Sequence, residues 1–119
     1  MDDRLGLVGL GAIAHELAGN LSYGQQKLLS LACCLAMVGD LLLLDEPVAG
    51  VNPEMADRIL NLLAQLREKG ETIVFIEHDI EAVRKVADRV IVMDEGKVIA
   101  SGPAEEILAK EQIVEAYLA

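Results

Sequence analysis

The sequence predicts an α/β fold with a mainly parallel sheet, and three features carry this prediction. Two short apolar runs, Leu41–Leu44 and Thr72–Ile76, have the length and composition of strands buried in a parallel sheet. A segment with helical periodicity separates them, as the crossover between two parallel strands requires. A C-terminal β-hairpin with helices after it completes the predicted order of elements.

The N-terminal part of the chain predicts helix and turns. Residues 1–20 are rich in glycine and mixed in period, which predicts a short helix with turns around it. Residues 25–38 are apolar nearly all round, which predicts a buried helix that ends before the leucine run. Cys33 and Cys34 are adjacent within it, so they form neither a spaced disulfide framework nor the paired ligands of a zinc site. We expect inert core thiols.

The run LLLLDEP raises the question of why four leucines lead directly into two carboxylates. Four consecutive leucines fit neither a half-exposed strand nor one face of a helix, so we expect a strand covered on both sides. At roughly 1.5 to 3 kcal/mol per leucine, its burial contributes at most about 6 to 12 kcal/mol. Asp45 and Glu46 follow at the carboxyl end, which is where open parallel sheets bind ligands.

The segment after the carboxylates is the clearest helix in the sequence. Asn52 is a typical N-cap, Pro53 suits the first helical position, and Gly70 follows the expected end. One apolar stripe runs along this helix, formed by Met55, Ile59, Leu63 and Leu66. The run 72–76 then predicts the second buried strand, because it is apolar and rich in β-branched residues.

The remaining elements follow from turn and capping signals. The second strand ends at Glu77, His78 and Asp79, and a helix is expected from there to Asp88. Two strands at 89–93 and 97–100 flank the turn DEGK, which predicts a hairpin in which Gly96 takes a positive φ. Pro103 is expected to open a helix through Lys110, and a last amphipathic segment reaches Leu118.

Composition limits the classes of function. The chain has 119 residues, and ten basic against twenty acidic residues give a net charge of −10. This charge repels phosphate backbones and anionic lipids, and there is no basic stripe, so no nucleic-acid partner is expected. The apolar stretch 28–38 is too short to cross a bilayer, and the N-terminus has no signal-peptide pattern. We therefore expect a cytoplasmic protein.

Polar groups at two strand ends form the first candidate site. Asp45 and Glu46 follow one predicted strand and His78 follows the other, so all three are expected at the same edge of the sheet. One carboxylate to hold a metal ion, a second to orient water and a nearby imidazole are the groups that phosphoryl transfer uses. Taken singly, the acidic pair reads as the first polar residues after a core, and the histidine as a structural residue.

The segment NLSYGQQ adds a second candidate. Ser22 has a short hydroxyl, Gly24 allows close backbone approach, and a long helix begins at once. The free N–H groups at a helix start bind anions, so this segment is a candidate phosphate seat. The competing interpretation is an ordinary N-cap with a glycine beside it.

Together these segments resemble a known family. LSYGQ resembles the signature motif of ABC transporter ATPases, and LLLLDEP resembles their Walker B strand with its catalytic glutamate. AGVNP resembles their D-loop, and FIEHD resembles the segment with their switch histidine. The four motifs stand in the family's order, and the resemblance runs from about Val8 to the C-terminus. Tyr23, the Asn-Pro pair of the D-loop and the tail IVEAYLA are similar to the ATP-binding subunits of branched-chain amino acid importers.

The resemblance implies a RecA-like P-loop NTPase fold, ATP and Mg²⁺ as cofactors, and a role for each matching residue. By this resemblance Asp45 is a ligand of Mg²⁺, Glu46 is the general base, and His78 contacts the γ-phosphate. In the family, two subunits sandwich ATP head to tail and dock on transmembrane permease subunits, which places them at the inner face of the membrane. Ser22, Gly24 and Gln25 would touch the γ-phosphate of the nucleotide that the opposite subunit holds. Asn52 would communicate across the same interface.

The family's P-loop is missing from this sequence. The pattern G-x-x-x-x-G-K-[ST] needs a hydroxyl residue after Gly-Lys, but the only Gly-Lys pair, Gly96 and Lys97, precedes Val98. The chain thus resembles the C-terminal half of such a subunit, with 1–24 as the end of the helical subdomain and 25–119 as part of the ATPase core. Without a phosphate cradle we expect no ATP hydrolysis by this chain alone. The leucine strand should also leave an exposed edge and an apolar face prone to association.

Two other functions compete with an ATPase subunit. A truncated or non-catalytic interaction module fits the missing P-loop. The segment VGLGAIA, Val8–Ala14, matches the dinucleotide pattern G-x-G-x-x-A of an oxidoreductase, but the acidic residue that should follow some twenty positions on is missing.

Overall fold

The computed structural model describes residues 2–37 and 39–118 and divides into two compact units, Met1–Phe75 and Ile76–Ala119. The fold is α/β, with one parallel and one antiparallel pair of strands among the described residues, as the sequence predicts. None of the helices in the described part of the chain has the length and apolar character needed to cross a membrane. The predicted boundary at residue 24 stays a prediction.

The first unit begins with short helices. Helix α1 spans Asp2–Leu7, and two 3-10 turns follow, η1 at Gly11–Ile13 and η2 at Ala18–Asn20. This agrees with the expected short helix and turns. The G-x-G-x-x-A match therefore lies on helical turns, without the strand that a dinucleotide-binding fingerprint requires before it.

Helix α2 spans Tyr23–Ala36 and is buried along one face only. Its buried residues are Leu28, Leu31 and Ala32. The prediction of a helix buried all round is wrong, and so is the prediction of core thiols, since Cys33 and Cys34 are both exposed and free. The reason is geometric: five and six residues after Leu28, at about 3.6 residues per turn, they lie on the opposite side of the helix. The predicted helix end at Val38 lies outside the described residues.

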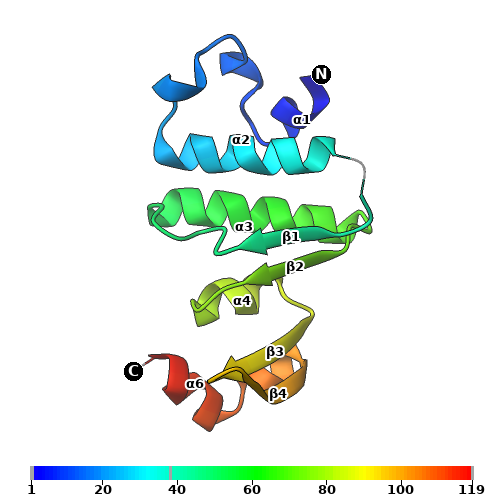
Figure 1. Cartoon of the computed structure of the whole chain (residues 1–119), viewed down its shortest axis with the longest axis vertical. Helices are drawn as coiled ribbons and strands as arrows, with labels where there is room; N and C mark the ends of the chain where they lie inside the picture. The colour runs from blue at the N-terminus through cyan, green and yellow to red at the C-terminus, as the bar shows by residue number, and fades with distance from the viewer. Residues whose placement is uncertain (1, 38, 119) are drawn as a thin grey trace. The chain divides into compact units, whose positions relative to one another are not determined.

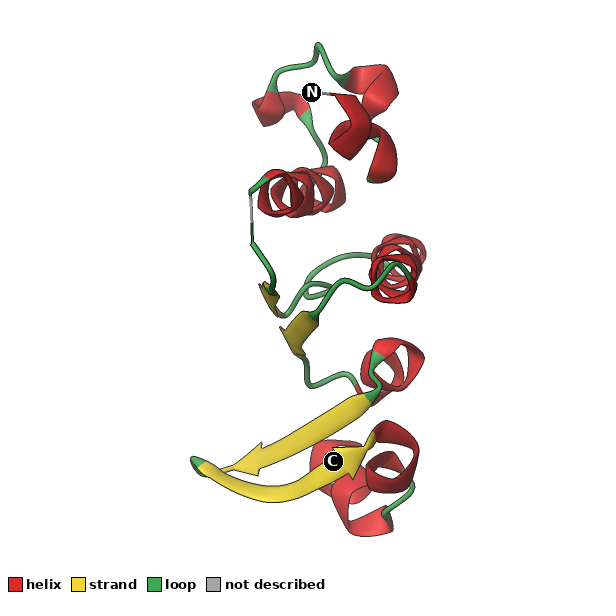
Figure 2. Ribbon diagram, turned by 90° about the vertical axis from the view of Figure 1, so that its right-hand side faces the viewer, coloured by secondary structure: helices red, strands yellow, loops and turns green. Residues whose placement is uncertain are grey.

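Strands β1, Leu42–Asp45, and β2, Ile73–Ile76, run parallel and adjacent (Figure 1). The Leu42 N–H donates to the Thr72 carbonyl at 2.9 Å, just before β2. Helix α3, Pro53–Glu68, connects the two strands and lies to one side of them (Figure 2). The segment 42–76 is therefore a strand–helix–strand unit.

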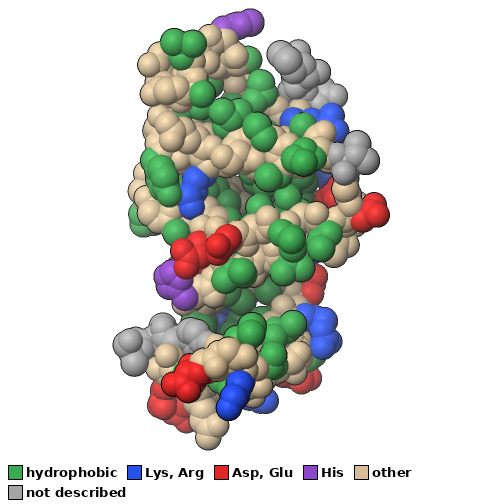
Figure 3. All heavy atoms as spheres, viewed as in Figure 1, with side chains coloured by type: hydrophobic (Ala, Val, Ile, Leu, Met, Phe, Trp, Pro, Cys, Tyr) green, Lys and Arg blue, Asp and Glu red, His purple; other side chains and the backbone are tan. Residues whose placement is uncertain are grey.

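The leucine strand is covered on one face only, so the prediction that it is covered on both is wrong. Leu42 is 9 % exposed, whereas Leu43 is 66 % exposed and Val74 on β2 is 50 % exposed. Alternate side chains of a strand point to opposite faces, and α3 covers one of these faces. The expected exposed apolar face is confirmed, and Figure 3 shows apolar side chains gathered over these strands.

Helix α3 follows its sequence signals closely. The Asn52 side chain accepts a hydrogen bond from the Met55 N–H at 2.8 Å, Pro53 is the first helical residue, and Gly70 takes a φ of +95° after the end. The apolar stripe is buried from its second member onward, at Ile59, Leu63 and Leu66. Leu63, at 0 % exposed, and Leu28 of α2, at 1 %, are the most deeply buried large side chains in the described part of the chain.

The second unit contains α4 at Ile80–Val86, β3 at Arg89–Asp94, β4 at Lys97–Pro103, α5 at Ala104–Leu108 and α6 at Glu111–Leu118. The predicted hairpin is confirmed, with β3 and β4 antiparallel. Helix α4 ends before Asp88, because Ala87 already has extended backbone.

The hairpin turn and the core of the second unit complete the fold. Glu95 and Gly96 both have positive φ, at +46° and +76°, which is the pattern of a type I′ turn. The sequence pointed only to Gly96. One face of the hairpin packs on α5 and α6 through Val92, Ile107 and Ile113.

Candidate functional site

The start of α2 carries the predicted phosphate seat, and its side chains bond to each other. The Ser22 hydroxyl accepts from the Gln25 N–H at 3.2 Å, and the Gln25 carboxamide oxygen accepts from the Ser22 N–H at 3.0 Å. This reciprocal pair is a capping box, which satisfies two N–H groups at the helix start. The ordinary N-cap interpretation therefore holds for these two residues. Phosphate binding here stays a prediction, and a phosphate would compete with the cap.

Gly24 has a packing role that the sequence did not reveal. A Cβ at this position would lie 2.6 Å from the Met55 side chain of α3, so a larger residue would force that side chain or the backbone around it to shift. Tyr23 makes a similar approach, because a Cβ on Gly50 would lie 3.1 Å from its ring. The first turn of α2 thus contacts the loop and helix start that follow β1.

The two carboxylates lie at the end of β1, as predicted. Asp45 is the last residue of the strand and is exposed, while Glu46 is half-buried. Glu46 has a φ of +48°, in the left-handed region that non-glycine residues rarely adopt. A residue in this region is strained, and such strain clusters at functional sites. Nothing in the sequence signals it, since glutamate before proline ordinarily has extended backbone.

Lys27 of α2 reaches this strained turn. Its ammonium group donates to the Glu46 carbonyl at 3.0 Å and lies 3.4 Å from the Pro47 carbonyl. The Ala49 N–H also donates to the Glu46 carbonyl, at 3.1 Å. Nothing in the sequence singles out Lys27, because a lysine in a helix gives no signal of its own. The structure therefore brings the predicted signature segment and the Asp45–Glu46 pair together within one unit.

Asn52 and His78 occupy different settings. The Asn52 side chain caps α3, and its role at a subunit interface stays a prediction. His78 is exposed and belongs to the second unit, where the next residue, Asp79, caps α4 by accepting from the N–H groups of Glu81 and Ala82. The expected meeting of His78 with Asp45 and Glu46 likewise stays a prediction.

The acidic pair does not form a complete metal site by itself. Among residues 2–37 and 39–118, no three or more His, Cys, Asp or Glu side chains are arranged to hold a metal ion. Mg²⁺ sites of nucleotide enzymes use one or two carboxylates with substrate phosphates and water as the other ligands. Asp45, an exposed carboxylate at a strand end, fits this chemistry as a single protein ligand.

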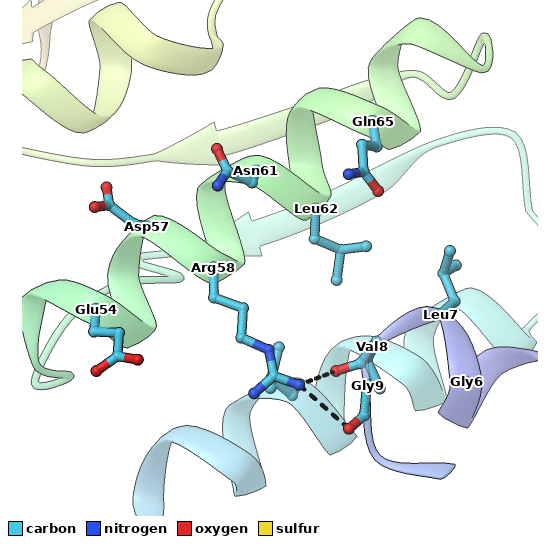
Figure 4. A pocket seen from close by; sticks show the side chains of 11 residues that line it. Gly6, Leu7, Val8, Gly9, Glu54, Asp57, Arg58, Asn61, Leu62 and Gln65 are labelled. Atoms are coloured by element: carbon cyan, nitrogen blue, oxygen red, sulfur yellow. Dashed lines mark hydrogen bonds between the residues drawn. The ribbon is translucent and has the colours of Figure 1, made fainter.

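A separate groove of about 380 Å³ lies between the N-terminal segment and α3 (Figure 4). Arg58 of α3 points across it and donates to the carbonyls of Val8 and Gly9, at 3.2 Å each. Gly9 has a φ of +78°, and the Arg58 guanidinium occupies the space that a Cβ would need. None of the predicted site residues lines this groove. The arginine bridge therefore has a structural role, in which it holds the Val8–Gly9 turn against α3.

Comparisons with known proteins identify the family. The family model described as "AAA domain, putative AbiEii toxin, Type IV TA system" matches residues 11–84. The chain is 39 % identical over 112 residues to the high-affinity branched-chain amino acid transport ATP-binding protein BraF of Pseudomonas aeruginosa, covering 93 % of this chain and 44 % of BraF. It is 40 % identical over 109 residues to the nickel import ATP-binding protein NikO of Rhodobacter capsulatus, covering 89 % and 43 % of the two chains.

Solved structures agree. The ADP conformation of MJ1267, an ATP-binding cassette of an ABC transporter, superposes with a TM-score of 0.87 at 33 % identity, covering 99 % of this chain and 48 % of that one. The cbiO1 protein of Clostridium perfringens, part of the ABC transporter complex cbiONQ, gives 0.84 at 36 % identity, covering 98 % and 47 %. The chain therefore belongs to the family of ABC transporter ATP-binding proteins, and it spans about half the length of the curated relatives that it matches.

Proposed function

We propose that this chain is the part of an ABC transporter ATPase that supplies the hydrolytic carboxylate and the signature segment. Glu46 is the general base that orients the attacking water, Asp45 is a ligand of Mg²⁺, and His78 contacts the γ-phosphate of ATP. The observation that carries the proposal is the strained Glu46 at the end of β1, next to the exposed Asp45. Backbone strain clusters at functional sites, and the hairpin turn that accounts for the positive φ of Glu95 has no counterpart at Glu46.

The signature segment acts on a second nucleotide. Ser22, Gly24 and Gln25 contact the γ-phosphate of the ATP held by the opposite subunit, and Asn52 communicates across the same interface. Two such subunits pair head to tail and dock on transmembrane permease subunits, at the cytoplasmic face of the membrane. The net charge of −10 opposes any contact with nucleic acid.

The chain alone hydrolyses no ATP. Its sequence holds no P-loop pattern, so little neutralises the charge of the β- and γ-phosphates, and Asp45 by itself recruits Mg²⁺ weakly. Phosphate release from the purified chain should therefore stay at the level of a buffer blank. Turnover by the chain that Glu46→Gln abolished would contradict this expectation.

The catalytic role is tested in a chimera, called the cassette chimera, in which the P-loop half of BraF is fused before this chain. We expect ATP hydrolysis by the chimera, and a fall of about 10² to 10⁴ in kcat on Glu46→Gln, the range for removal of a general base. Glu71→Gln is the matched control, since Glu71 is exposed and lies before β2. A folded chimera that binds ATP without turnover, or full turnover by Glu46→Gln, would refute the proposal.

The transported solute is proposed from the relatives. BraF is named as a branched-chain amino acid transport protein and NikO as a nickel import protein. We favour branched-chain amino acids, because Tyr23 and the tail IVEAYLA are similar to the ATP-binding subunits of branched-chain amino acid importers. Pseudomonas aeruginosa cells that carry the cassette chimera in place of BraF should recover leucine uptake. Uptake of nickel but not leucine would overturn this choice.

A non-catalytic interaction module is the second candidate. The exposed apolar face of β1 and β2, which includes Leu43 and Val74, favours association with another polypeptide. A soluble chimera that binds its permease partners but never hydrolyses ATP would support this candidate over the first.

A further inference from the structure

The Glu46–Pro47 turn adopts a backbone conformation that the local sequence opposes. Glu46 has a φ of +48°, whereas a residue before proline favours extended backbone with negative φ. Such a conformation persists only where the surrounding structure enforces it. The direction in which the Glu46 side chain leaves the strand depends on this φ, so whatever enforces the turn also sets the position of the carboxylate.

Lys27 makes a long-range contact to this turn. Its ammonium group donates to the Glu46 carbonyl at 3.0 Å and lies 3.4 Å from the Pro47 carbonyl, in a partly buried position. One charged donor thus contacts the carbonyls on both sides of the Pro47 Cα, and the first of these carbonyls belongs to the left-handed residue itself. Hydrogen bonds from a charged donor are stronger than neutral ones, and partial burial limits the competition from water.

The position of Lys27 is itself supported by its neighbours. Its ammonium nitrogen lies 5.5 Å from the centre of the Tyr23 ring, within cation–π range. The same ring rests against Gly50, whose φ is +75°. The lysine side chain is therefore held between the first turn of α2 and the loop after β1, and these contacts fix its position.

We propose that Lys27 is a positioning residue for ATP hydrolysis. It holds Glu46 in the left-handed conformation and so links the geometry of the hydrolytic carboxylate to the first turn of α2, which carries Ser22, Gly24 and Gln25. This inference rests on the proposed function, because it assigns a consequence for catalysis to the backbone of Glu46. The conformational part stands independently and is tested without nucleotide.

The primary test is NMR of the full chain with ¹³C-labelled Glu46, since Cα and carbonyl shifts report φ and ψ. In Lys27→Met, which keeps the apolar stem and removes the donors, the shifts of Glu46 should move from left-handed towards extended values. Lys27→Arg should retain the left-handed shifts. Lys69→Met is the matched control, because Lys69 is exposed at the end of α3 and should leave Glu46 unchanged. Unchanged Glu46 shifts in Lys27→Met overturn the proposal.

A second variant covers the case in which Lys27→Met fails to fold. Lys27→Gln keeps a polar end but loses the charge and the reach, so it should also shift Glu46. Far-UV circular dichroism verifies that each variant is folded. Left-handed Glu46 shifts in folded Lys27→Gln overturn the proposal in the same way.

The catalytic consequence is measured in the cassette chimera. Lys27→Met should lower kcat by about tenfold to a hundredfold while the KM for ATP changes by less than about twofold, because a misplaced carboxylate affects the transition state and not nucleotide binding. Lys27→Arg should restore most of kcat. Unaltered kcat in Lys27→Met overturns the catalytic part. A chimera without any turnover is a failure of the proposed function, and the carbon shifts of the full chain still decide the role of Lys27.

Discussion

Replacing Leu42 and Leu43 separately by alanine measures how β1 is covered. The two leucines are adjacent and chemically identical, but Leu42 is 9 % exposed and Leu43 is 66 % exposed. Leucine to alanine at buried sites costs about 2.7 to 5 kcal/mol, and Leu42, which is not completely enclosed, should lie near the lower end, at about 3 kcal/mol. Leu43 is only one third covered, so losing its three outer carbons, at roughly 0.8 kcal/mol each when buried, should cost about 0.8 kcal/mol.

Urea unfolding followed by far-UV circular dichroism distinguishes these values. With a slope of about 1.5 kcal/mol per molar urea, the midpoint should fall by about 2 M for Leu42→Ala and about 0.5 M for Leu43→Ala. Equal destabilisation by the two variants would show that both faces of the strand are covered, which would contradict the one-sided packing of β1. In the cassette chimera, the Leu43→Ala effect should grow if the added half covers the exposed face.

Three further predictions concern capping, backbone strain and thiol access. Asn52→Ala removes the side-chain acceptor at the start of α3 and should lower the free energy of unfolding by about 1 kcal/mol in urea titrations; an unchanged midpoint would contradict the cap. Gly50→Ala places a side chain at positive φ against the Tyr23 ring and should cost about 1 to 2 kcal/mol by the same assay, whereas a stabilised variant would contradict the geometry. Cys33 and Cys34 are exposed, so a thiol reagent should modify both in the folded chain, and protection of either would restore the core-thiol interpretation.

The candidate site divides into parts that local sequence specifies and parts that it does not. Ser22 and Gln25 form a capping box because a serine three residues before glutamine at a helix start is a local signal. Asp45 and Glu46 fall at the end of β1 because the apolar run ends there. The positive φ of Glu46 has no local signal, since the following proline favours the opposite conformation. Its partner Lys27 lies nineteen residues earlier in the chain, beyond the reach of any periodicity argument.

The order of the elements, the cap and stripe of α3, the hairpin and the family motifs can all be read from the sequence, because each depends on neighbours within a few residues. The covered faces of these elements depend on tertiary packing. Cys33, Cys34 and Leu43 are exposed, although their local sequence predicts burial in the core. Hydrophobicity shows that a side chain prefers burial, but the element that covers it comes from elsewhere in the chain, and α3 covers only one face of β1.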